Sequence, residues 1–595
     1  MRNRYFEDEA YDVKVRYNKV GRVISYLGPY KKKLVLLGIF VVLMGFLVLV
    51  PPYLNSLIVD DVMVKQKPNY VAIAAFAISA WFLIHTSNVA FEYIRYNVMA
   101  KTAYSVVRDI RRELFYHLQT LSFDYYDNRP GGKILVRVTS YIDEISNVFH
   151  RSIFGILMDG IRLFLILVWM FILDYRFAVA AVAVLAPMAV ILFFIQKILH
   201  HRYRELRNKI SNRTAYIAEN IQGIQVTKAF NRAALNTKIY SELNNETISR
   251  WYKVVHVQEF FWPIFDAFIN LGVVGVYVLV FILAQKPDIN MPVSLGKLLS
   301  FIMYLSMFAA PLVNISAYLQ EIGSANSNLE RIFETMDTPP SVYDCADAYD
   351  LPQVAGHVEF DDVTFGYEKD RIILEHFCLD VPAGKTIALV GPTGAGKSTV
   401  VNLLSRFYEA GENKIRIDGH DISKVKLHSL RAQVGVMMQD PFLFSASVTD
   451  NIRYARPGAS DEDCVNAAEK AGCDEFIRKL PQGYGTVLAE KAAGLSAGEI
   501  QLLSLARIIL TDPRILILDE ATSSIDTETE AKIQSALAEV IKGRTSFIVA
   551  HRLSTIKNAD VIIVIHKGKI RETGRHDELI ALGGIYKKLY DIQFL

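Results

Sequence analysis

Long runs of apolar residues dominate the first 330 positions of the chain, and few charges interrupt them. About 20 apolar residues are enough for one helix to cross a bilayer. The pattern predicts six such spans, at about residues 34–59, 70–91, 152–173, 177–196, 260–285 and 298–320. We therefore expect residues 1–330 to form an α-helical transmembrane domain.

Lysine and arginine residues gather in the two long connections that follow the second and fourth spans. The short connections 60–69, 174–176 and 286–297 carry few of them. Positively charged segments stay on the cytoplasmic side of a membrane. The pattern therefore predicts a multi-pass protein of the plasma (inner) membrane, with both termini and the second half of the chain in the cytoplasm.

The two long connections also have apolar residues at helical spacing, such as Val106, Ile110 and Leu114. We interpret them as long cytoplasmic helical extensions of the spans. Each contains a break at which the chain is expected to reverse, at 122–132 and around 212–223. Such reversals are either simple hairpins or docking surfaces for a soluble domain.

Three charged residues lie inside the predicted spans, where a charge is costly and usually serves a function. Asp159 and Arg162 are separated by one helical turn and can pair on one face, which favours a structural role. Asp266 has no obvious local partner, so the sequence favours it for lining a polar cavity. The aromatic residues around Asp266 are more often packing residues than ligand contacts, and we assign no substrate contact.

The second half of the chain has a different pattern. Residues 331–355 contain Pro339 and Pro340 and little periodicity, which indicates a linker. Residues 356–595 alternate strand-like runs with helical ones, as in an α/β domain. The net charge of +3 and the spacing of the four cysteines indicate neither nucleic acid binding nor a zinc site.

A glycine-rich loop lies between a strand-like run, Thr386–Val390, and a run at 399–408 that is expected to be helical. Its sequence is Gly391-Pro392-Thr393-Gly394-Ala395-Gly396-Lys397-Ser398, and Thr399 follows. The glycines let backbone N–H groups surround phosphate oxygens, Lys397 reaches the β- and γ-phosphates, and Ser398 can bind Mg²⁺. The alternative is a glycine-rich turn that only caps a helix. The strand–loop–helix context favours a nucleoside triphosphate site at residues 391–399.

A second run, 515–518, is entirely apolar and is followed by Asp519 and Glu520. Buried parallel strands have this composition, and ligands bind at their carboxyl ends. Asp519 is placed to hold Mg²⁺, directly or through water, and Glu520 to orient or polarise the attacking water. Together with the upstream loop, this pair indicates ATP hydrolysis.

The segment between these motifs, Leu495-Ser496-Ala497-Gly498-Glu499, resembles the Leu-Ser-Gly-Gly-Gln signature of ATP-binding cassette (ABC) transporters. Tyr367 is similar to the family's aromatic residue that stacks on adenine, and Gln439 to its Q-loop glutamine, which contacts Mg²⁺ and the transmembrane interface. The run 523–526 resembles the D-loop, which contributes Asp526, and His551 resembles the switch histidine near the γ-phosphate. With six spans before one such domain, the chain resembles a half-size type IV ABC exporter.

The resemblance implies a six-span helical domain followed by an α/β P-loop NTPase domain with a helical subdomain, which uses ATP and Mg²⁺. It assigns catalysis to Glu520, His551 and Gln439, and Mg²⁺ binding to Ser398, Gln439 and Asp519. It assigns nucleotide binding to Tyr367, Gly391, Pro392, Thr393, Gly394, Ala395, Gly396, Lys397, Ser398, Thr399, Ser496, Gly498 and Asp526.

A chain with one ATPase domain must, by this resemblance, work as a dimer, because the signature completes the site of the other domain. The two reversals then resemble the family's coupling helices. Ala497 and Glu499 depart from the signature, which has Gly and Gln at these positions. The methyl group of Ala497 is expected to crowd the phosphate, and the carboxylate of Glu499 to repel it. The residues of the hydrolysis set, Lys397, Asp519, Glu520 and His551, are intact. We therefore hypothesise that this chain is the catalytically competent subunit of a heterodimer. The alternative is that the chain forms a homodimer in which the changes at Ala497 and Glu499 are tolerated.

The resemblance thus implies ATP-driven export of amphipathic solutes, such as drug-like compounds, lipids or peptides. The expected partners are a second ABC half-transporter, the lipid bilayer and a small amphipathic substrate, and nucleic acid is not expected. One alternative is a membrane ATPase that acts as a sensor or regulator without solute transport, and another is a homodimeric lipid flippase.

Overall fold

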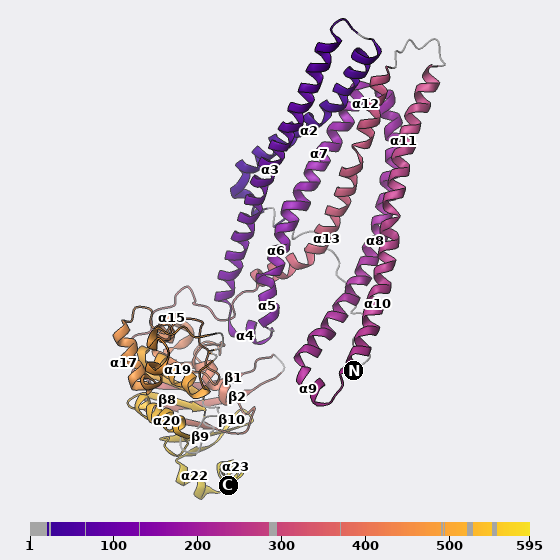
Figure 1. Cartoon of the computed structure of the whole chain (residues 1–595). Helices are drawn as coiled ribbons and strands as arrows, with labels where there is room; N and C mark the ends of the chain where they lie inside the picture. The colour runs from indigo at the N-terminus through magenta and orange to yellow at the C-terminus, as the bar shows by residue number, and fades with distance from the viewer. Residues whose placement is uncertain are drawn as a thin grey trace. The chain divides into compact units, whose positions relative to one another are not determined.

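The structure is a computed structural model of the whole chain. It describes residues 21–22, 25–65, 67–129, 131–284, 294–368, 371–489, 492, 494–519, 527–549 and 556–594. The chain divides into two compact units, whose elements are labelled in Figure 1. The first unit comprises Met1–Gln119 and Gly131–Thr338, and the second comprises Thr120–Pro130 and Pro339–Leu595.

The first unit is built from helices (Figure 1). Its long helices are α2 (Lys31–Leu57), α3 (Tyr70–Thr120), α7 (Phe154–Leu173), α8 (Tyr175–Gln222), α10 (Ala233–Glu259), α11 (Phe261–Ala284), α12 (Leu295–Ser306) and α13 (Ala309–Asp337). Shorter helical segments are η2 (Gly28–Tyr30), η3 (Ile58–Val64), α5 (Gly131–Val138), α6 (Ser140–Asn147), η4 (Val148–Ile153) and α9 (Ile224–Ala229).

Five helical stretches among the described residues are long and apolar enough to cross a membrane. They are Gly28–Val64, Tyr70–Thr120, Gly131–Leu173, Ala233–Ile282 and Leu295–Leu319. A shorter apolar stretch, Tyr175–Met188, forms the first part of α8 and falls at the fourth predicted span. The prediction of a helical transmembrane domain is confirmed.

The parts of α3 and α8 that extend beyond the membrane spans are stabilised by apolar residues buried along one face of each helix. In α3, Val106, Ile110 and Leu114 are buried on one face, so the helix continues well beyond its apolar window. The extension in α8 packs against α10. Tyr216 of α8 is buried there, and its hydroxyl donates a hydrogen bond to the Asn236 carbonyl oxygen at 3.2 Å.

This packing corrects the predicted position of the second reversal. We expected the chain to turn around 212–223, but α8 continues unbroken to Gln222 because it packs against α10 through this region. The chain turns instead through α9 and Asn231, which has a left-handed backbone with φ of 50°. The first reversal lies where it was predicted, at the short helix α4 (Phe123–Asp127).

The second unit contains two sheets (Figure 1). The smaller has the order β2-β1-β4-β5, formed by β1 (Val358–Phe365), β2 (Leu374–Val381), β4 (Ile415–Ile417) and β5 (His420–Asp421). The larger has the order β10-β9-β3-β8-β7-β6, formed by β3 (Thr386–Val390), β6 (Val434–Met437), β7 (Ile515–Asp519), β8 (Thr545–Val549), β9 (Val561–His566) and β10 (Lys569–Gly574). All neighbours in the larger sheet are parallel except β9 and β10.

Helices cover this parallel sheet, as expected for strands buried on both faces. The helices of this unit include α14 (Lys397–Leu404), α15 (Leu427–Gln433), α16 (Val448–Arg453), α17 (Asp461–Ala471), α18 (Asp474–Lys479), α19 (Ala497–Thr511), α20 (Thr527–Ile541), α22 (His576–Leu582) and α23 (Ile585–Phe594). Helices α16, α17 and α19 pack together in a helical subdomain. The predicted α/β domain with a helical subdomain is confirmed.

Helix α14 ends earlier than predicted. The sequence suggested a helix over 399–408, but the helix stops at Leu404 and Arg406 has a left-handed backbone with φ of 49°. The buried Arg406 guanidinium donates hydrogen bonds to the carbonyl oxygens of Val425 at 2.8 Å and Tyr343 at 3.0 Å. These tertiary contacts hold the turn in a conformation that local propensity does not favour.

The predicted linker, 331–355, has two parts in the structure. Helix α13 continues through its beginning, to Asp337. Farther on, Leu351 and Val354 are buried in the core of the second unit. The backbone N–H of Leu351 donates to Ser429 Oγ, and that of Val354 to Gln433 Oε1, both at 2.9 Å.

Candidate nucleotide site

The glycine-rich loop connects the buried strand β3 to α14, which is the context that the sequence predicted. Two of its glycines are required by the geometry. A Cβ atom at Gly391 would lie 2.2 Å from the Ile565 carbonyl oxygen. Gly396, at the N-cap of α14, has φ of 109°, and a Cβ there would lie 2.8 Å from Leu374 Cδ2. A larger residue at either position would displace the loop.

Lys397 is the first residue of α14, and its side chain is buried. Its Nζ donates hydrogen bonds to the carbonyl oxygens of Gly391 at 2.7 Å and Pro392 at 3.2 Å, which hold the ammonium group within the loop. Burial lowers the pKa of Lys397, and the negative charge of Asp519 opposes that shift. Asp519 is therefore close enough to act electrostatically on Lys397. Ser398 is exposed and Thr399 is buried.

The strand order brings several predicted site residues to one edge of the sheet. Asp519 is the last residue of β7, and in the register of β8 it pairs with Val549. Gln439 is exposed and lies two residues beyond β6, which is parallel to β7. Because β3, β8, β7 and β6 are parallel neighbours, the segments that follow them lie at the same edge. Three predicted residues of this edge, Glu520, Asp526 and His551, lie outside the described residues.

Tyr367 lies beside the start of α14. Its hydroxyl donates to Thr399 Oγ1 at 3.3 Å and accepts from Asn402 Nδ2 at 3.2 Å. Its ring meets the Tyr408 ring edge to face, with centroids 4.8 Å apart. The side chain is anchored at its hydroxyl end, and the residue is still 44% exposed. Such an anchored and exposed ring is suited to stacking on a flat base.

The signature segment begins α19. Ser496 is the N-cap, and Glu499 completes a capping box with it. Glu499 Oε2 accepts hydrogen bonds from the Ser496 backbone N–H at 2.7 Å and from its hydroxyl at 2.9 Å. A Ser followed three positions later by a Glu is the sequence pattern of a capping box, a role of Glu499 that the resemblance to the family signature does not reveal. Ala497 is exposed and Gly498 is buried.

Helix α4 docks within the second unit, although it lies between helices of the first unit in the chain. The rings of Phe123 and Phe407 stack with centroids 4.4 Å apart. The backbone N–H of Val342 donates to Ser122 Oγ at 2.8 Å. The Tyr408 hydroxyl donates to the Asp127 carboxylate. Of the two interpretations of the first reversal, the structure therefore favours the docking surface over the simple hairpin.

Tyr408 is a site residue that the sequence analysis missed. Its hydroxyl contacts α4 and its ring contacts Tyr367, so it joins the docked reversal to the residue proposed to stack on adenine. In the sequence, Tyr408 is one of 30 tyrosines and belongs to no motif, so no local pattern distinguishes it.

We expect Phe123→Ala to loosen the docking of α4. Loss of the stacked ring should cost about 1–2 kcal/mol, because the pair loses both aromatic contact and buried area. Hydrogen–deuterium exchange of residues 120–130 should then accelerate about tenfold. Phe115→Ala, which removes an exposed ring of α3, is the matched control and should leave this exchange unchanged. Equal exchange in both variants would contradict the docking role of Phe123.

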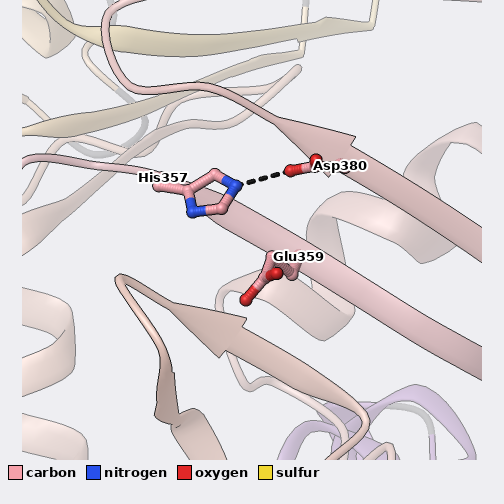
Figure 2. A group of neighbouring side chains, drawn as sticks. All are labelled: His357, Glu359 and Asp380. Carbon is pink, nitrogen blue, oxygen red and sulfur yellow. Dashed lines mark hydrogen bonds and ion pairs between the residues drawn. The ribbon is translucent and has the colours of Figure 1, made fainter.

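A separate group of possible metal ligands lies on the smaller sheet (Figure 2). It comprises His357, Glu359 of β1 and Asp380 of β2, whose ligand atoms lie within 4.8 Å of one another. Glu359 and Asp380 are directly opposite each other across the two strands. His357 Nε2 lies 2.5 Å from Asp380 Oδ1, so this nitrogen already has a carboxylate partner. We interpret the group as an ion pair that relieves repulsion between the two acids.

This ion pair makes a pH-dependent contribution to stability. The hydrogen bond to Asp380 raises the pKa of His357, and the charges of Asp380, Glu359 and Asp418 add to the effect. The stabilisation is therefore fully present below the unfolded value of about 6.5 and is lost as the pH rises through the higher folded value. Because the pair is largely exposed, its contribution to the free energy of unfolding should be below about 1 kcal/mol. An NMR titration should give His357 a pKa above 6.5, and Asp380→Asn should lower it; an unchanged value would contradict the pairing.

Comparison with known proteins identifies the family. The family model for the ABC transporter transmembrane region matches residues 34–312, and the ABC transporter model matches residues 374–523. The chain is 36% identical over 592 residues to an uncharacterized ABC transporter ATP-binding protein, YknV, of Bacillus subtilis, covering 99% of this chain and 97% of that protein. The chain belongs to the ABC transporter family.

Other relatives of this ABC transporter are consistent with export. A putative multidrug export ATP-binding/permease protein of Staphylococcus aureus is 33% identical over 586 residues, covering 97% of this chain and all of that protein. The solved structure of a bacterial Atm1-family ABC exporter with ATP bound superposes with a TM-score of 0.80 at 28% identity, over 95% of this chain and 98% of that one.

These comparisons confirm several predictions. The chain is a half-size ABC exporter, a multi-pass membrane protein whose ATPase domain drives transport. The ABC domain binds ATP, and the half-size architecture implies a dimer. The roles assigned to individual site residues remain predictions.

Proposed function

We propose that this ABC exporter moves amphipathic solutes out of the cell across the plasma membrane, as the catalytically competent half of a heterodimer. The observation that carries the proposal is the pairing of a well-formed phosphate loop with an altered signature. Lys397 is held inside the loop, whereas a carboxylate already occupies the start of α19. Both termini and the ATPase domain would lie in the cytoplasm, in agreement with the distribution of positive charge.

Mg²⁺ would be held by side-chain oxygens of Ser398, Gln439 and Asp519. Hard oxygen ligands of this kind suit Mg²⁺; Ser398 and Gln439 lie beyond the ends of β3 and β6, and Asp519 is the last residue of β7 in the same sheet. When bound, the ion would neutralise phosphate charge. The chain itself supplies the other functions: Lys397 binds the phosphates, Tyr367 stacks on the base and Glu520 orients the attacking water. His551 would donate a hydrogen bond to the γ-phosphate.

The altered signature supports a weaker second site. The N-terminus of a helix attracts anions, and in α19 the Glu499 carboxylate accepts two hydrogen bonds there from Ser496. A phosphate approaching Ser496 would meet a like charge and compete for the same hydroxyl. Our interpretation is that this signature contacts a nucleotide that stays bound and is hydrolysed only slowly. A partner's signature would complete the site that contains Glu520.

We expect Glu499→Gln to strengthen nucleotide binding at the site that this signature completes. A glutamine can form the same capping box without the negative charge, so the fold of α19 should be preserved. The affinity for ATP in the assembled dimer should rise several-fold, measured by equilibrium titration with a fluorescent ATP analogue. Glu462→Gln, on the exposed first turn of α17, is the control for loss of one charge. An unchanged affinity in Glu499→Gln would contradict the repulsion argument.

An exposed apolar surface supports contact with a second subunit. On α9 and the turn that follows it, Val226 is 62% exposed and Phe230 is 72% exposed. Apolar residues clustered on an exposed turn are typical of an interaction site. The family architecture implies a dimer, and this turn is our proposed contact with the partner chain.

The heterodimer proposal is tested by purifying the full chain alone in lipid nanodiscs and measuring ATP hydrolysis. We expect slow hydrolysis that solutes do not stimulate, and recovery when a second half-transporter is supplied. Vigorous, drug-stimulated hydrolysis by the chain alone would favour the homodimer. Vesicles that contain the dimer should move a solute only with ATP; hydrolysis without movement would instead favour a sensor or regulator.

A further inference from the structure

Two adjoining cavities lie among the helices of the first unit. The first has a volume of about 360 Å³ and is lined by residues of α2, α3, η4, α7 and α13, including Arg95, Arg151, Asp159, Arg162 and Asn314. The second has a volume of about 520 Å³. Both volumes are in the range of small-molecule sites. Met44, Val48, Glu92 and Arg162 line both cavities, so Arg162 lies where the two meet.

The charged residues of the first cavity differ in how well they are satisfied. Glu92 forms an ion pair with Arg95. Asp159 accepts a hydrogen bond from Asn314 Nδ2 at 3.1 Å. Arg162, in contrast, has a buried Nε without a hydrogen-bond partner, and no ion pair to it occurs among the described residues. Asp159 and Arg162, which the sequence suggested as a pair, interact through their charges but form no direct ion pair, and the hydrogen-bond partner of Asp159 is Asn314.

Unsatisfied polar atoms concentrate at these cavities. Five buried side-chain nitrogen or oxygen atoms in the described part of the chain lack a hydrogen-bond partner. Three of them, Asn88 Oδ1, Arg95 Nε and Arg162 Nε, belong to residues that line the two cavities. Buried groups are normally satisfied, because leaving one unpaired costs about 1–3 kcal/mol. Such a concentration indicates a place where a ligand supplies the missing partner.

The second cavity is mainly apolar where it extends away from Arg162. Its lining there includes Trp81, Pro52, Met303 and Met307. Methionine side chains adapt to irregular apolar ligands, and a tryptophan ring offers a large flat contact. The second cavity therefore has the Arg162 guanidinium at its junction with the first cavity and an apolar wall beyond it.

Asp266, which the sequence favoured for lining a polar cavity, lies elsewhere. Its carboxylate accepts a hydrogen bond from Asn270 Nδ2 at 3.0 Å, one turn along α11. Asp266 is exposed and lines neither of the two cavities described above. The local partner exists because Asn270 follows at the helical spacing of four residues.

We propose that these cavities bind an anionic amphiphile, with its acidic group on the Arg162 guanidinium and its apolar part against Trp81, Met303 and Met307. The buried Nε of Arg162 is a donor without an acceptor, and a monoanionic phosphate, sulfate or carboxylate group is the acceptor that matches a guanidinium best. A cationic ligand is disfavoured, because the two carboxylates of the first cavity already have partners. The assignment rests on the proposed export function and names its substrate class.

The test uses the full chain in phosphatidylcholine nanodiscs without nucleotide. Three probes share a brominated dodecyl chain, whose bromine quenches tryptophan fluorescence: ω-bromododecyl methyl phosphate, ω-bromododecyltrimethylammonium and ω-bromododecanol. We expect the phosphate probe to bind about tenfold more tightly than the other two, as for a charge-assisted hydrogen bond. Trp81→Phe should remove most of the quenching. Tighter or equal binding of the ammonium probe would overturn the proposal, as would full quenching in Trp81→Phe.

Variants at Arg162 test the acidic-group contact. Arg162→Gln should weaken the phosphate probe about tenfold and abolish the preference for it, whereas Arg162→Lys should retain the preference. Arg176→Gln, at the start of α8 and outside both cavities, is the matched control and should bind like the unaltered chain. If Arg162→Gln keeps the preference, the proposal is wrong. If Arg162→Gln does not fold, loss of the preference in the conservative Arg162→Lys would overturn it, and retention would support it.

Two further arms identify the source of the acidic group. Inorganic phosphate at millimolar concentration should not displace the probe, and displacement would overturn the amphiphile assignment. Phosphatidylglycerol in the nanodisc should compete if the natural ligand is a membrane lipid and should not compete if it is a free amphiphile; both results keep the assignment. Because no ATP is present, a negative result refutes only this site, whereas binding without ATP-dependent transport refutes only the export function.

Discussion

Replacing Glu520 with Gln is expected to reduce ATP hydrolysis at least about 100-fold while leaving ATP binding intact. A positioned general base contributes about 10²–10⁴ in rate, and an amide of the same shape cannot accept a proton from water. Glu520 directly follows Asp519 at the carboxyl end of β7, the edge of the sheet that carries the phosphate loop. Phosphate release at saturating ATP and equilibrium binding of a fluorescent ATP analogue measure the two quantities separately.

The control for this variant is Glu539→Gln. Glu539 lies on α20 of the same domain and forms an exposed ion pair with Lys542, which is worth little. Its replacement should leave hydrolysis within about twofold of the unaltered chain. Retention of more than about a tenth of the hydrolysis rate in Glu520→Gln would refute the catalytic assignment, because a general base cannot be so dispensable.

Replacing Lys397 with Met is expected to weaken ATP binding about 10- to 100-fold and to reduce hydrolysis further. The Nζ of Lys397 lies inside the glycine-rich loop, where it donates to the carbonyl oxygens of Gly391 and Pro392. Hydrogen bonds to a charged group are worth about 1.5–3 kcal/mol each, so losing the ammonium removes a large part of the phosphate contact. Methionine keeps most of the apolar length of the side chain, so the packing of α14 should persist.

Lys385→Met provides the matched control. Lys385 directly precedes β3, whereas the glycine-rich loop follows the other end of that strand. The Lys385 ammonium group lies 3.4 Å from the Asp560 carboxylate. Its replacement should change the affinity for ATP by no more than about twofold. The Lys397 and Glu520 variants are also distinguishable from each other, since one should lose binding and the other only turnover. Unchanged ATP affinity in Lys397→Met would show that the loop does not contact the phosphates.

The sequence predicted those elements whose residues have only one plausible environment. The bounds of β3 agree with the strand-like run at 386–390, and β7 covers the apolar run at 515–518, because a short apolar run between turn residues is typical of a buried strand. The membrane helices follow from the same reasoning at greater length, since about 20 apolar residues in succession have no other suitable environment. Motif spacing then located the phosphate loop.

Positions that depend on a distant partner were not predictable in this way. The end of α8 depends on its packing against α10, and the turn after α14 depends on the buried contacts of Arg406. Likewise, the contacts of Tyr408 with Tyr367 and with Asp127 of α4 join residues that are distant in the sequence. Each partner is far away in the chain, so no window of neighbouring residues contains the information.

The capping box at Ser496, in contrast, does not depend on a distant partner. Its two residues are three positions apart, and the pattern was readable in the sequence. The same residues also belong to the segment that resembles the family signature, and that resemblance implies a contact with phosphate but says nothing of a helix cap. A local rule and a family motif can therefore describe the same residues without exhausting their roles.

By itself, the sequence determined that this protein is a half-size ABC exporter with a phosphate loop, an acidic pair after β7 and an altered signature. These features are local, because each depends on residue types at short fixed spacings. Only the tertiary structure decided that α4 docks within the ATPase unit and that Arg162 lines both of the cavities described in the first unit. Whether a buried charge is satisfied depends on donors and acceptors from different helices, here α3, α7 and α13, and only the packed structure brings those together.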